Sequence, residues 1–330
     1  MLAKPSKISI VTPSFNQGRY IEQTICSVLD QGYSNLEYII IDGGSTDETL
    51  AIIKKYERHL TFWVSEKDKG QTNAINKGYV HCTGEIFNWI NSDDYYEPGT
   101  FEKLAAYFSD SRVDVVCGKE WAFYDQQPDN IVNETRSFIS QDLYKTIRAG
   151  IIDQPCTFFR RKKIASFFPL HVSLRYVMDR QLWWQYLLQN GQDRILQVED
   201  VFTRFRLHEE SKSILEGHYF SDEFEQLKES LFRQLHAPDD LLKQVKVNAA
   251  SLPLNWPVRS EQREQILAAF ASSFAERRYV EKNRIELKKL TALLKSWKGY
   301  RMDTTEWKWW LTAHCLPSKA FHYLKNRNHP

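Results

Sequence analysis

Short apolar runs alternate along the first part of the chain with segments in which apolar residues recur every three or four positions. The short runs are rich in β-branched residues and predict strands over Ile8–Thr12, Leu36–Ile41, Phe62–Val64, Ile86–Ile90 and Val113–Cys117. Helical spacing predicts a helix that passes through Ile21 and Leu29 and is closed by Gly32, and another over Asn73–Val80. This alternation is typical of an α/β fold, in which a mostly parallel sheet is flanked by helices.

Beyond about residue 120 the pattern is less regular. Trp121–Tyr124 is a further candidate strand, and a helix is expected to begin near Asp179. From about Gln262 to Trp297 the chain has the pattern of charged helices, whereas Trp297–Pro330 mixes Trp, Lys, Arg and His without clear periodicity. We therefore expect an α/β domain over 1–215, with halves meeting near residue 118, and a mainly helical C-terminal extension over 216–330.

The composition is that of an ordinary globular protein, with 42% apolar and 26% charged residues in a chain of 330. The sequence has no run of eighteen apolar residues, and its N-terminal apolar stretch is too short for a signal peptide. Its five cysteines are scattered and never in CxxC spacing, which favours free thiols over disulfides or structural zinc. A cytoplasmic, reducing environment is therefore expected.

Charge is distributed unevenly along the chain. From Arg277 onward there are 13 basic and 4 acidic residues, a net charge of +9, which leaves −7 for the part before it. An acidic body argues against a nucleic-acid partner. The basic tail also carries several tryptophans, which either pack the tail onto the fold or lie at an anionic membrane surface: Trp297, Trp307, Trp309 and Trp310.

Polar turns follow three of the predicted strands, over Pro13–Gly18, Asp42–Asp47 and Asn91–Asp94. In an open parallel sheet, ligands bind beyond the carboxyl ends of the strands, so these turns are expected to form one binding site. Ser45 and Glu48 have the spacing of a capping box for the helix that follows. The chain contains neither a Walker loop nor a GxGxxG motif, which argues against a dinucleotide site.

The carboxylates of these turns have more than one interpretation. Asp93 and Asp94 are suited to hold a hard divalent cation beside a diphosphate, whose charge the cation would neutralise, or they form a solvated acidic turn. Asp42 can accept a hydrogen bond from a nucleobase imide or a ribose hydroxyl, or its turn serves only to cap a helix. The residues alone leave these alternatives open.

Taken in order, these motifs resemble glycosyltransferase family 2, whose members have the GT-A fold with a Rossmann-like sheet. The resemblance rests on Thr12–Asn16, Asp42–Asp47, Asp68–Gly78 and Asn91–Asp94. It covers residues 7–118 well and extends more loosely to about residue 213. It implies that residues 1–215 are a catalytic domain, with a nucleotide-sugar half to about 118 and an acceptor half from about 119.

The resemblance also implies roles for matching residues of the first half. Asp42 would bind the base, Asp68 would lie near the base or ribose, and Asp93 and Asp94 correspond to the family's motif for Mn²⁺ or Mg²⁺. The residues assigned to the donor are Thr12, Pro13, Ser14, Asp42, Asp68 and Asp93. Many members begin the metal motif with Asp where this chain has Asn91, and an amide is a weaker ligand than a carboxylate.

In the second half, Asp179 matches the family's acidic residue ahead of a Leu-Trp helix, which serves there as general base. The reaction requires such a base, although an Asp near a helix N-terminus also favours the helix dipole. Gln154–Phe159 resembles a stretch that lines the acceptor floor. His208 would complete the metal shell or contact the diphosphate, or be a hydrogen-bonded structural residue, and Lys212 would offset phosphate charge.

These roles imply transfer of a single sugar from a nucleotide-diphosphate sugar, with a UDP-sugar as the expected donor, to an acceptor hydroxyl with inversion. A glycan or lipid-linked glycan is the expected acceptor, with contact at the inner face of an anionic membrane. The Gln-x-x-Arg-Trp motif of processive members does not occur. Two alternatives are a sugar nucleotidyltransferase, which the Pro13–Arg19 loop disfavours, and a non-catalytic nucleotide-sugar-binding scaffold, which Asn91 favours.

Overall fold

The computed structural model describes residues 6–245 and 251–316. The chain divides into two compact units. The first comprises Met1–Ile139 and Gly150–Glu223, and the second comprises Ser140–Ala149 and Phe224–Pro330. The first unit contains a sheet covered by helices. The described part of the second unit consists of helices joined by loops.

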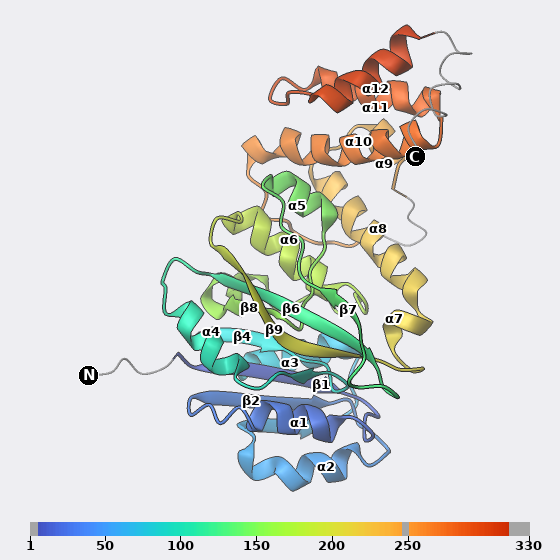
Figure 1. The fold of residues 1–330 in the computed structure, drawn as a ribbon. Coiled ribbons are helices and arrows are strands. Elements are labelled where there is room, and N and C mark those ends of the chain that lie inside the picture. Colours follow the sequence, from blue (N-terminus) through green and yellow to red (C-terminus); the bar gives the residue numbers. More distant parts are fainter. Residues whose placement is uncertain (1–5, 246–250, 317–330) are drawn as a thin grey trace. The chain divides into compact units, whose positions relative to one another are not determined.

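A nine-stranded sheet of the described residues forms the centre of the first unit (Figure 1). Its strands are β1 (Ile8–Ser14), β2 (Leu36–Asp42), β3 (Phe62–Ser65), β4 (Ile86–Trp89), β5 (Tyr95–Tyr96), β6 (Val115–Tyr124), β7 (Ile131–Thr135), β8 (Thr157–Arg160) and β9 (Ile195–Leu207). Their order is β3-β2-β1-β4-β8-β6-β9-β5, and β7 pairs with β6. The first four strands are parallel, whereas β8 runs antiparallel to both β4 and β6. The predicted α/β fold with a mostly parallel sheet is confirmed.

The register of the parallel strands brings their carboxyl ends to one edge. Ser14 lies opposite Asp42 across β1 and β2, and Val11 lies opposite Trp89 across β1 and β4. The turns that follow these three strands therefore start from neighbouring positions, as expected for a ligand site in an open sheet.

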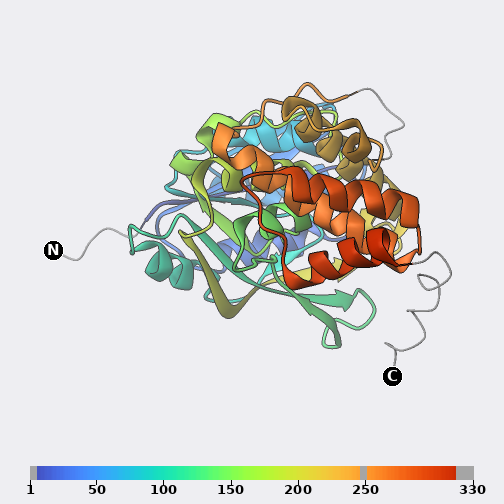
Figure 2. The same ribbon diagram turned by 90° about the horizontal axis from the view of Figure 1, so that it is seen from above.

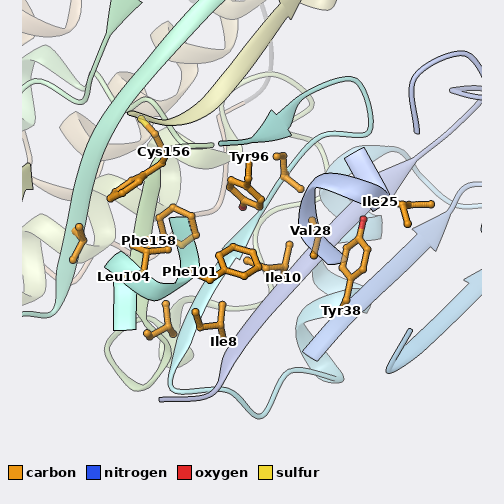
Figure 3. Packing of buried hydrophobic residues seen from close by; sticks show 14 of the residues in the cluster. Ile8, Ile10, Ile25, Val28, Tyr38, Tyr96, Phe101, Leu104, Cys156 and Phe158 are labelled. Atoms are coloured by element: carbon orange, nitrogen blue, oxygen red, sulfur yellow. The ribbon is translucent and has the colours of Figure 1, made fainter. Parts of the chain in front are cut away.

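Apolar side chains from both strands and helices bury one face of the sheet (Figure 3). Ile8 and Ile10 of β1 point to the same side because alternate residues of a strand share a face. Tyr38 of β2 packs beside them, as do Val28 of α1 (Ile21–Leu29) and Phe101 of α4 (Thr100–Phe108). The 3.6-residue spacing that predicted α1 is thus the spacing that buries its inner face.

The opposite face is covered by α3 (Gln71–Val80) and α6 (Met178–Asn190). A Cβ atom at Gly78 would lie 2.4 Å from Cγ1 of Val11, so only glycine allows α3 to approach β1 this closely. The ring of Trp183 in α6 lies 6.3 Å from that of Phe159 in β8. Both faces are therefore occupied, which explains the continuous apolar sequence of the central strands.

The remaining helices of the first unit are short: α2 (Thr49–Tyr56), α7 (Lys212–Leu215) and the 3-10 turns Glu57–His59, Arg161–Lys163 and Ala165–Phe167. The capping box predicted for α2 is wrong. Its N-cap residue is Glu48, with no side-chain cap, and the Ser45 hydroxyl instead donates to Asp42 at 2.5 Å. The Ser45 oxygen, which in a cap would accept from an amide of the helix, accepts from the amide of Asn16 at 2.7 Å.

The two strands predicted near residues 113–117 and 121–124 are one strand, β6. The pairing of β6 with β9 shifts register on both sides of Lys119, next to Gly118. A Cβ atom at Gly118 would lie 2.3 Å from the Phe202 ring, so the glycine permits a close approach at this irregularity. The bulge interrupts the apolar pattern but not the strand.

The helices of the second unit are α5 (Leu143–Ala149), α8 (Gly217–Gln234, which begins in the first unit), α9 (Asp239–Leu242), the 3-10 turn Ser260–Gln262, α10 (Arg263–Val280), α11 (Arg284–Ser296) and α12 (Thr304–Cys315). Figure 2 shows α10, α11 and α12 lying side by side. The described part of the tail is more regular than expected, because Asp303 and Glu306 form a capping box that starts α12. No helix of the described residues is both long and apolar enough to cross a bilayer.

Candidate active site

The turns after β1 and β2 are tied together by hydrogen bonds. The amide of Asn16 donates to the Ser45 hydroxyl at 2.7 Å, and the amide of Thr46 donates to the Asn16 side chain at 2.9 Å. Asn16 has φ of 51°, a left-handed conformation that Asn adopts more readily than most residues. The two turns thus form one continuous rim at the sheet edge.

Side chains at the end of β1 are largely buried. The hydroxyl of Thr12 lies 3.1 Å from that of Tyr38, and Ser14 is buried with its hydroxyl unpaired among the described residues. Pro13, between them, continues the strand and lies opposite Ile41. The Ser14 hydroxyl thus differs from that of Thr12, which lies beside a tyrosine hydroxyl.

Asp42 is fully buried, and its carboxylate shapes the second turn. It accepts from the amides of Gly44 and Ser45 at 3.1 and 2.9 Å, and from the hydroxyls of Ser45 and Ser65, each at 2.5 Å. Four donors occupy the two oxygens. Asp42 therefore fixes the conformation of the turn that the predicted base site would use.

Asp68 lies against the same turn. A Cβ atom at Gly43 would be 3.3 Å from both Asp68 carboxylate oxygens and from Cδ2 of Phe15, whose ring is exposed. The Asp68 carboxylate also accepts from the amide of Gly70 at 2.7 Å. Phe15 was part of the motif that carried the resemblance, but no role was predicted for it. An exposed ring beside a carboxylate can stack on a planar ligand.

The third turn brings Asp93 to His208. Nε2 of His208 lies 3.1 Å from Oδ2 of Asp93, although the two residues are 115 positions apart in the chain. His208 is buried, its ring lies 4.5 Å from that of Tyr20, and its Nδ1 has no partner among the described residues. The Asp93 side chain is 23% exposed. A carboxylate oxygen and an imidazole nitrogen from distant parts of the chain thus meet at a partly exposed place.

Asp94 is turned inward. It is 1% exposed and accepts from the backbone amide of Arg206 at 3.0 Å and from the Asn91 side chain at 3.3 Å. Burial, and then the charge of Asp93, raise the pKa of the Asp94 carboxyl well above its usual range. Within 6–245 and 251–316, no group of three or more His, Cys, Asp or Glu side chains is arranged to hold a metal ion.

Arg206 fixes this turn and was not singled out in the sequence. Its Nε donates to the carbonyl of Asp93 at 2.9 Å, and its other nitrogens donate to Asp125 and Gln23, each at 2.5 Å. The guanidinium lies 5.0 Å from each of the rings of Tyr20 and Phe123. Arg206 lies near the end of β9 and His208 directly follows the strand, but only the fold brings the Asp93 turn to them.

Lys212 and Asn91 are linked through Gln71. The Gln71 amide nitrogen donates to Oδ1 of Asn91 at 2.7 Å, and Nζ of Lys212 donates to Oε1 of Gln71 at 2.8 Å. Lys212 also lies 5.8 Å from the Tyr176 ring centre. This chain of contacts brings a cation to the third turn, where Asn91 precedes the carboxylates.

Asp179 lies in the first turn of α6. Its carboxylate accepts from the amide of Arg180 at 2.8 Å. Burial, with a smaller contribution from the charge of Asp153, raises the pKa of Asp179 to about 6. The segment entering α6 is held by Glu223, which accepts from the amides of Arg175, Tyr176 and Val177 at 2.8, 2.8 and 3.1 Å. A carboxylate with this pKa is suited to accept a proton near neutral pH.

The segment before β8 is anchored to the end of β4. Nε2 of Gln154 donates to the carbonyl of Trp89 at 2.7 Å and to the Asn88 side chain at 2.6 Å. Because β4 ends two residues before Asn91, Gln154–Phe159 begins at the same sheet edge as the turns described above.

Comparison with known proteins agrees with this architecture. Residues 9–168 match the model of "Glycosyl transferase family 2". An uncharacterized glycosyltransferase of Rickettsia typhi is 30% identical over 213 residues, which cover 61% of this chain and 64% of the relative. The chain therefore matches less than two thirds of that relative's length.

Two solved structures share the fold. The crystal structure of TarS from S. aureus has a TM-score of 0.57 and 17% identity, covering 96% of this chain and 52% of that one. Residues 1–349 of TarS in complex with UDP-GlcNAc give a TM-score of 0.54 and 16% identity, covering 88% and 81%. The solved structures show the shared fold, and the match to the family model, with the order of the strand-end turns, identifies residues 9–168 as a glycosyltransferase family 2 region.

Proposed function

We propose that this protein transfers a single sugar from a UDP-sugar to an acceptor hydroxyl by metal-assisted inverting displacement. The observation that carries the proposal is the pairing of Asp93 with His208, 3.1 Å apart, at the sheet edge where the nucleotide turns begin. Its solved neighbour TarS was crystallised with UDP-GlcNAc, which supports a UDP-sugar as the donor. A glycan or lipid-linked glycan is the proposed acceptor.

The nucleotide would bind across the first two turns. The ring of Phe15 would stack on the base, and Asp68 would accept from the base or ribose. Asp42 would act through the turn it holds, because its oxygens already accept four hydrogen bonds. Thr12, Pro13 and Ser14 would line the pocket floor at the end of β1.

Asp93 and His208 are proposed to hold Mn²⁺ or Mg²⁺, since their ligand atoms converge and Asp93 is accessible. When bound, the cation would neutralise charge on the departing diphosphate. Asp94, predicted as a metal ligand, would in this arrangement act by fixing the turn against Arg206. Lys212 would add positive charge near the phosphates.

Asp179 is the proposed general base. It would take the proton of the acceptor hydroxyl while that oxygen attacks the anomeric carbon from the face opposite the nucleotide. Attack from the opposite face inverts the anomeric configuration. The raised pKa of about 6 leaves the carboxylate ionised at neutral pH and still basic enough to accept a proton.

A panel of UDP-, GDP- and dTDP-sugars tests the proposal, with calorimetric binding and nucleoside diphosphate release measured with Mn²⁺, Mg²⁺ or EDTA. We expect one donor to bind and to release nucleoside diphosphate, at a rate that EDTA lowers at least about tenfold. Donor binding without release would favour the scaffold alternative. In a parallel reaction that supplies a nucleoside triphosphate and a sugar 1-phosphate, consumption of both would favour the nucleotidyltransferase. If no nucleotide sugar binds and neither of these compounds is consumed, the transferase, the scaffold and the nucleotidyltransferase are all refuted.

For the second unit we propose peripheral contact with an anionic membrane, the enzyme being otherwise cytoplasmic. Trp297 and Trp309 pack inside the unit, but Trp307 and Leu311 of α12 are 40% and 51% exposed. They line an apolar recess of about 450 Å³. Nζ of Lys295 lies 5.4 Å from the centre of the Trp307 ring, so a cation accompanies the exposed apolar surface.

Sedimentation with phosphatidylcholine vesicles, with and without phosphatidylglycerol, tests the membrane contact. We expect binding only to the anionic vesicles, lowered several-fold by Leu311→Glu and by high salt. The matched control is Val80→Glu, at an exposed apolar position on α3 of the first unit. Equal binding to neutral vesicles, or no effect of Leu311→Glu, would reject the proposal.

A further inference from the structure

A row of polar residues crosses three strands of the first unit. Glu120 of β6 lies opposite Thr135 of β7 and opposite Thr203 of β9. Directly opposed residues of neighbouring strands point to the same face, so these side chains are neighbours. The carboxyl of Asp153 lies beside the row, since Thr135 lowers its pKa and its charge raises the pKa of Glu120.

Three oxygens of this row are buried without a hydrogen bond to any described residue: Oε2 of Glu120, Oδ2 of Asp153 and Oγ1 of Thr203. Glu120 is 7% exposed and Thr203 is fully buried. Leaving such a group unpaired is unfavourable, and buried polar atoms in native proteins nearly always have partners. The fold therefore keeps costly polar atoms that a sheet of apolar residues would avoid.

The row lies on the acceptor side of the proposed active site. Asp153 immediately precedes Gln154, which is bonded to the end of β4. Burial, followed by the charges of Asp153 and Asp94, raises the pKa of Glu120 well above its usual range. Asp153 also contributes to the raised pKa of Asp179. The carboxyl groups of Asp153 and Glu120 are thus electrostatically linked to the base and to the third turn, respectively.

The chemistry of the row favours a neutral ligand with hydroxyl groups. A protonated carboxyl both donates and accepts hydrogen bonds, as a sugar hydroxyl does, and the Thr203 hydroxyl does the same. A ligand hydroxyl can pair with such groups without bringing a charge into this buried place.

We propose that Glu120, Asp153 and Thr203 form a subsite that binds a non-reacting hydroxyl of a neutral sugar or polyol acceptor, next to the hydroxyl that Asp179 deprotonates. The proposal rests on the proposed transferase function. It names residues that select the acceptor, and it explains why unpaired polar atoms are retained at this place in the sheet.

Two variants that remove polar atoms at nearly constant volume test the subsite: Thr203→Val and Glu120→Leu. Methyl glycosides of glucose, galactose and N-acetylglucosamine, with glycerol and ribitol, serve as acceptor probes for the donor found in the panel. We expect both variants to raise the acceptor KM at least about tenfold, while the donor KM and the rate of donor hydrolysis without acceptor stay unchanged. Thermal midpoints should stay level or rise, because unpaired buried groups are removed.

Glu120→Gln should restore part of the acceptor affinity, because an amide also donates and accepts hydrogen bonds. The matched control is Glu199→Gln, at an exposed acidic position on β9, which should change none of these values. An unchanged acceptor KM in both Thr203→Val and Glu120→Leu would overturn the subsite and leave a structural role. Wild-type protein that hydrolyses its donor but is stimulated by none of the neutral probes would also overturn it. Absence of donor hydrolysis would instead refute the proposed function.

Discussion

Replacing Asp179 by asparagine should lower kcat about 1000-fold while leaving the donor dissociation constant within about twofold. Asparagine fills the same volume and can still accept from the amide of Arg180, so α6 should keep its start. It cannot take a proton from the acceptor hydroxyl. Donor affinity should be retained, because the proposed nucleotide contacts come from the turns after β1 and β2.

The control for this substitution is Asp193→Asn, at an exposed position just after α6, which should keep wild-type kcat. Single-turnover transfer with the identified donor and acceptor separates loss of chemistry from loss of binding. An Asp179→Asn enzyme with kcat within about threefold of wild type would exclude Asp179 as the base. Loss of donor binding in this variant would point to a structural role for the carboxylate.

The pH dependence of transfer follows from the same carboxyl. The pKa of Asp179 is raised to about 6, and the base must be ionised to act. As pH falls below 6, kcat/KM should therefore fall about tenfold per pH unit, and it should be level above about pH 7. This acidic limb should be absent from the residual activity of Asp179→Asn.

Replacing Asp93 by asparagine should lower kcat about 100-fold and raise the Mn²⁺ or Mg²⁺ concentration for half-maximal activity at least about tenfold. Asp93 is the accessible carboxylate of the third turn, and its Oδ2 faces Nε2 of His208. His208→Gln should have a similar but smaller effect. Metal titrations of activity, with isothermal titration of the metal in the presence of nucleoside diphosphate, measure both.

The double variant of Asp93 and His208 shows whether the two side chains hold one ion. If they do, the second substitution should raise the metal concentration for half-maximal activity much less in the double variant than it does alone. The effects of substitutions at residues that share a partner are not additive. Asp30→Asn, at an exposed carboxylate that follows α1, should leave the metal requirement unchanged. Independent, additive effects of the two substitutions would contradict a shared metal site.

Much of the fold follows from local pattern. The apolar runs from residue 8 onward form buried strands, and the predicted strands and helices of the first part lie within a few residues of those observed. Gly78 is required where α3 packs against β1. The edge at which the turns meet was also predictable. A parallel sheet places all carboxyl ends together, and three predicted strands end in polar turns.

Other predictions failed where a competing partner lies close by. Ser45 has the spacing of a helix cap, but its oxygen accepts from the amide of Asn16 and its hydroxyl donates to Asp42. The bulge beside Gly118 divides one strand into two apparent ones. In both cases a contact between residues distant in the sequence, Asn16 with Ser45 and Gly118 with Phe202, decided the local structure. A local sequence pattern does not show such contacts.

The sequence by itself determined the α/β class, the order of the strand-end turns and the identity of the carboxylates available to them. Only the tertiary structure decided which of those carboxylates are accessible. Asp94 turns inward because the amide of Arg206 on a distant strand binds it, whereas Asp93 faces His208. The row of Glu120 and Thr203 likewise depends on the register of β6 with β9. Spacing along a chain fixes local conformation, but contacts between distant segments depend on how strands pair and helices pack, which no local pattern specifies.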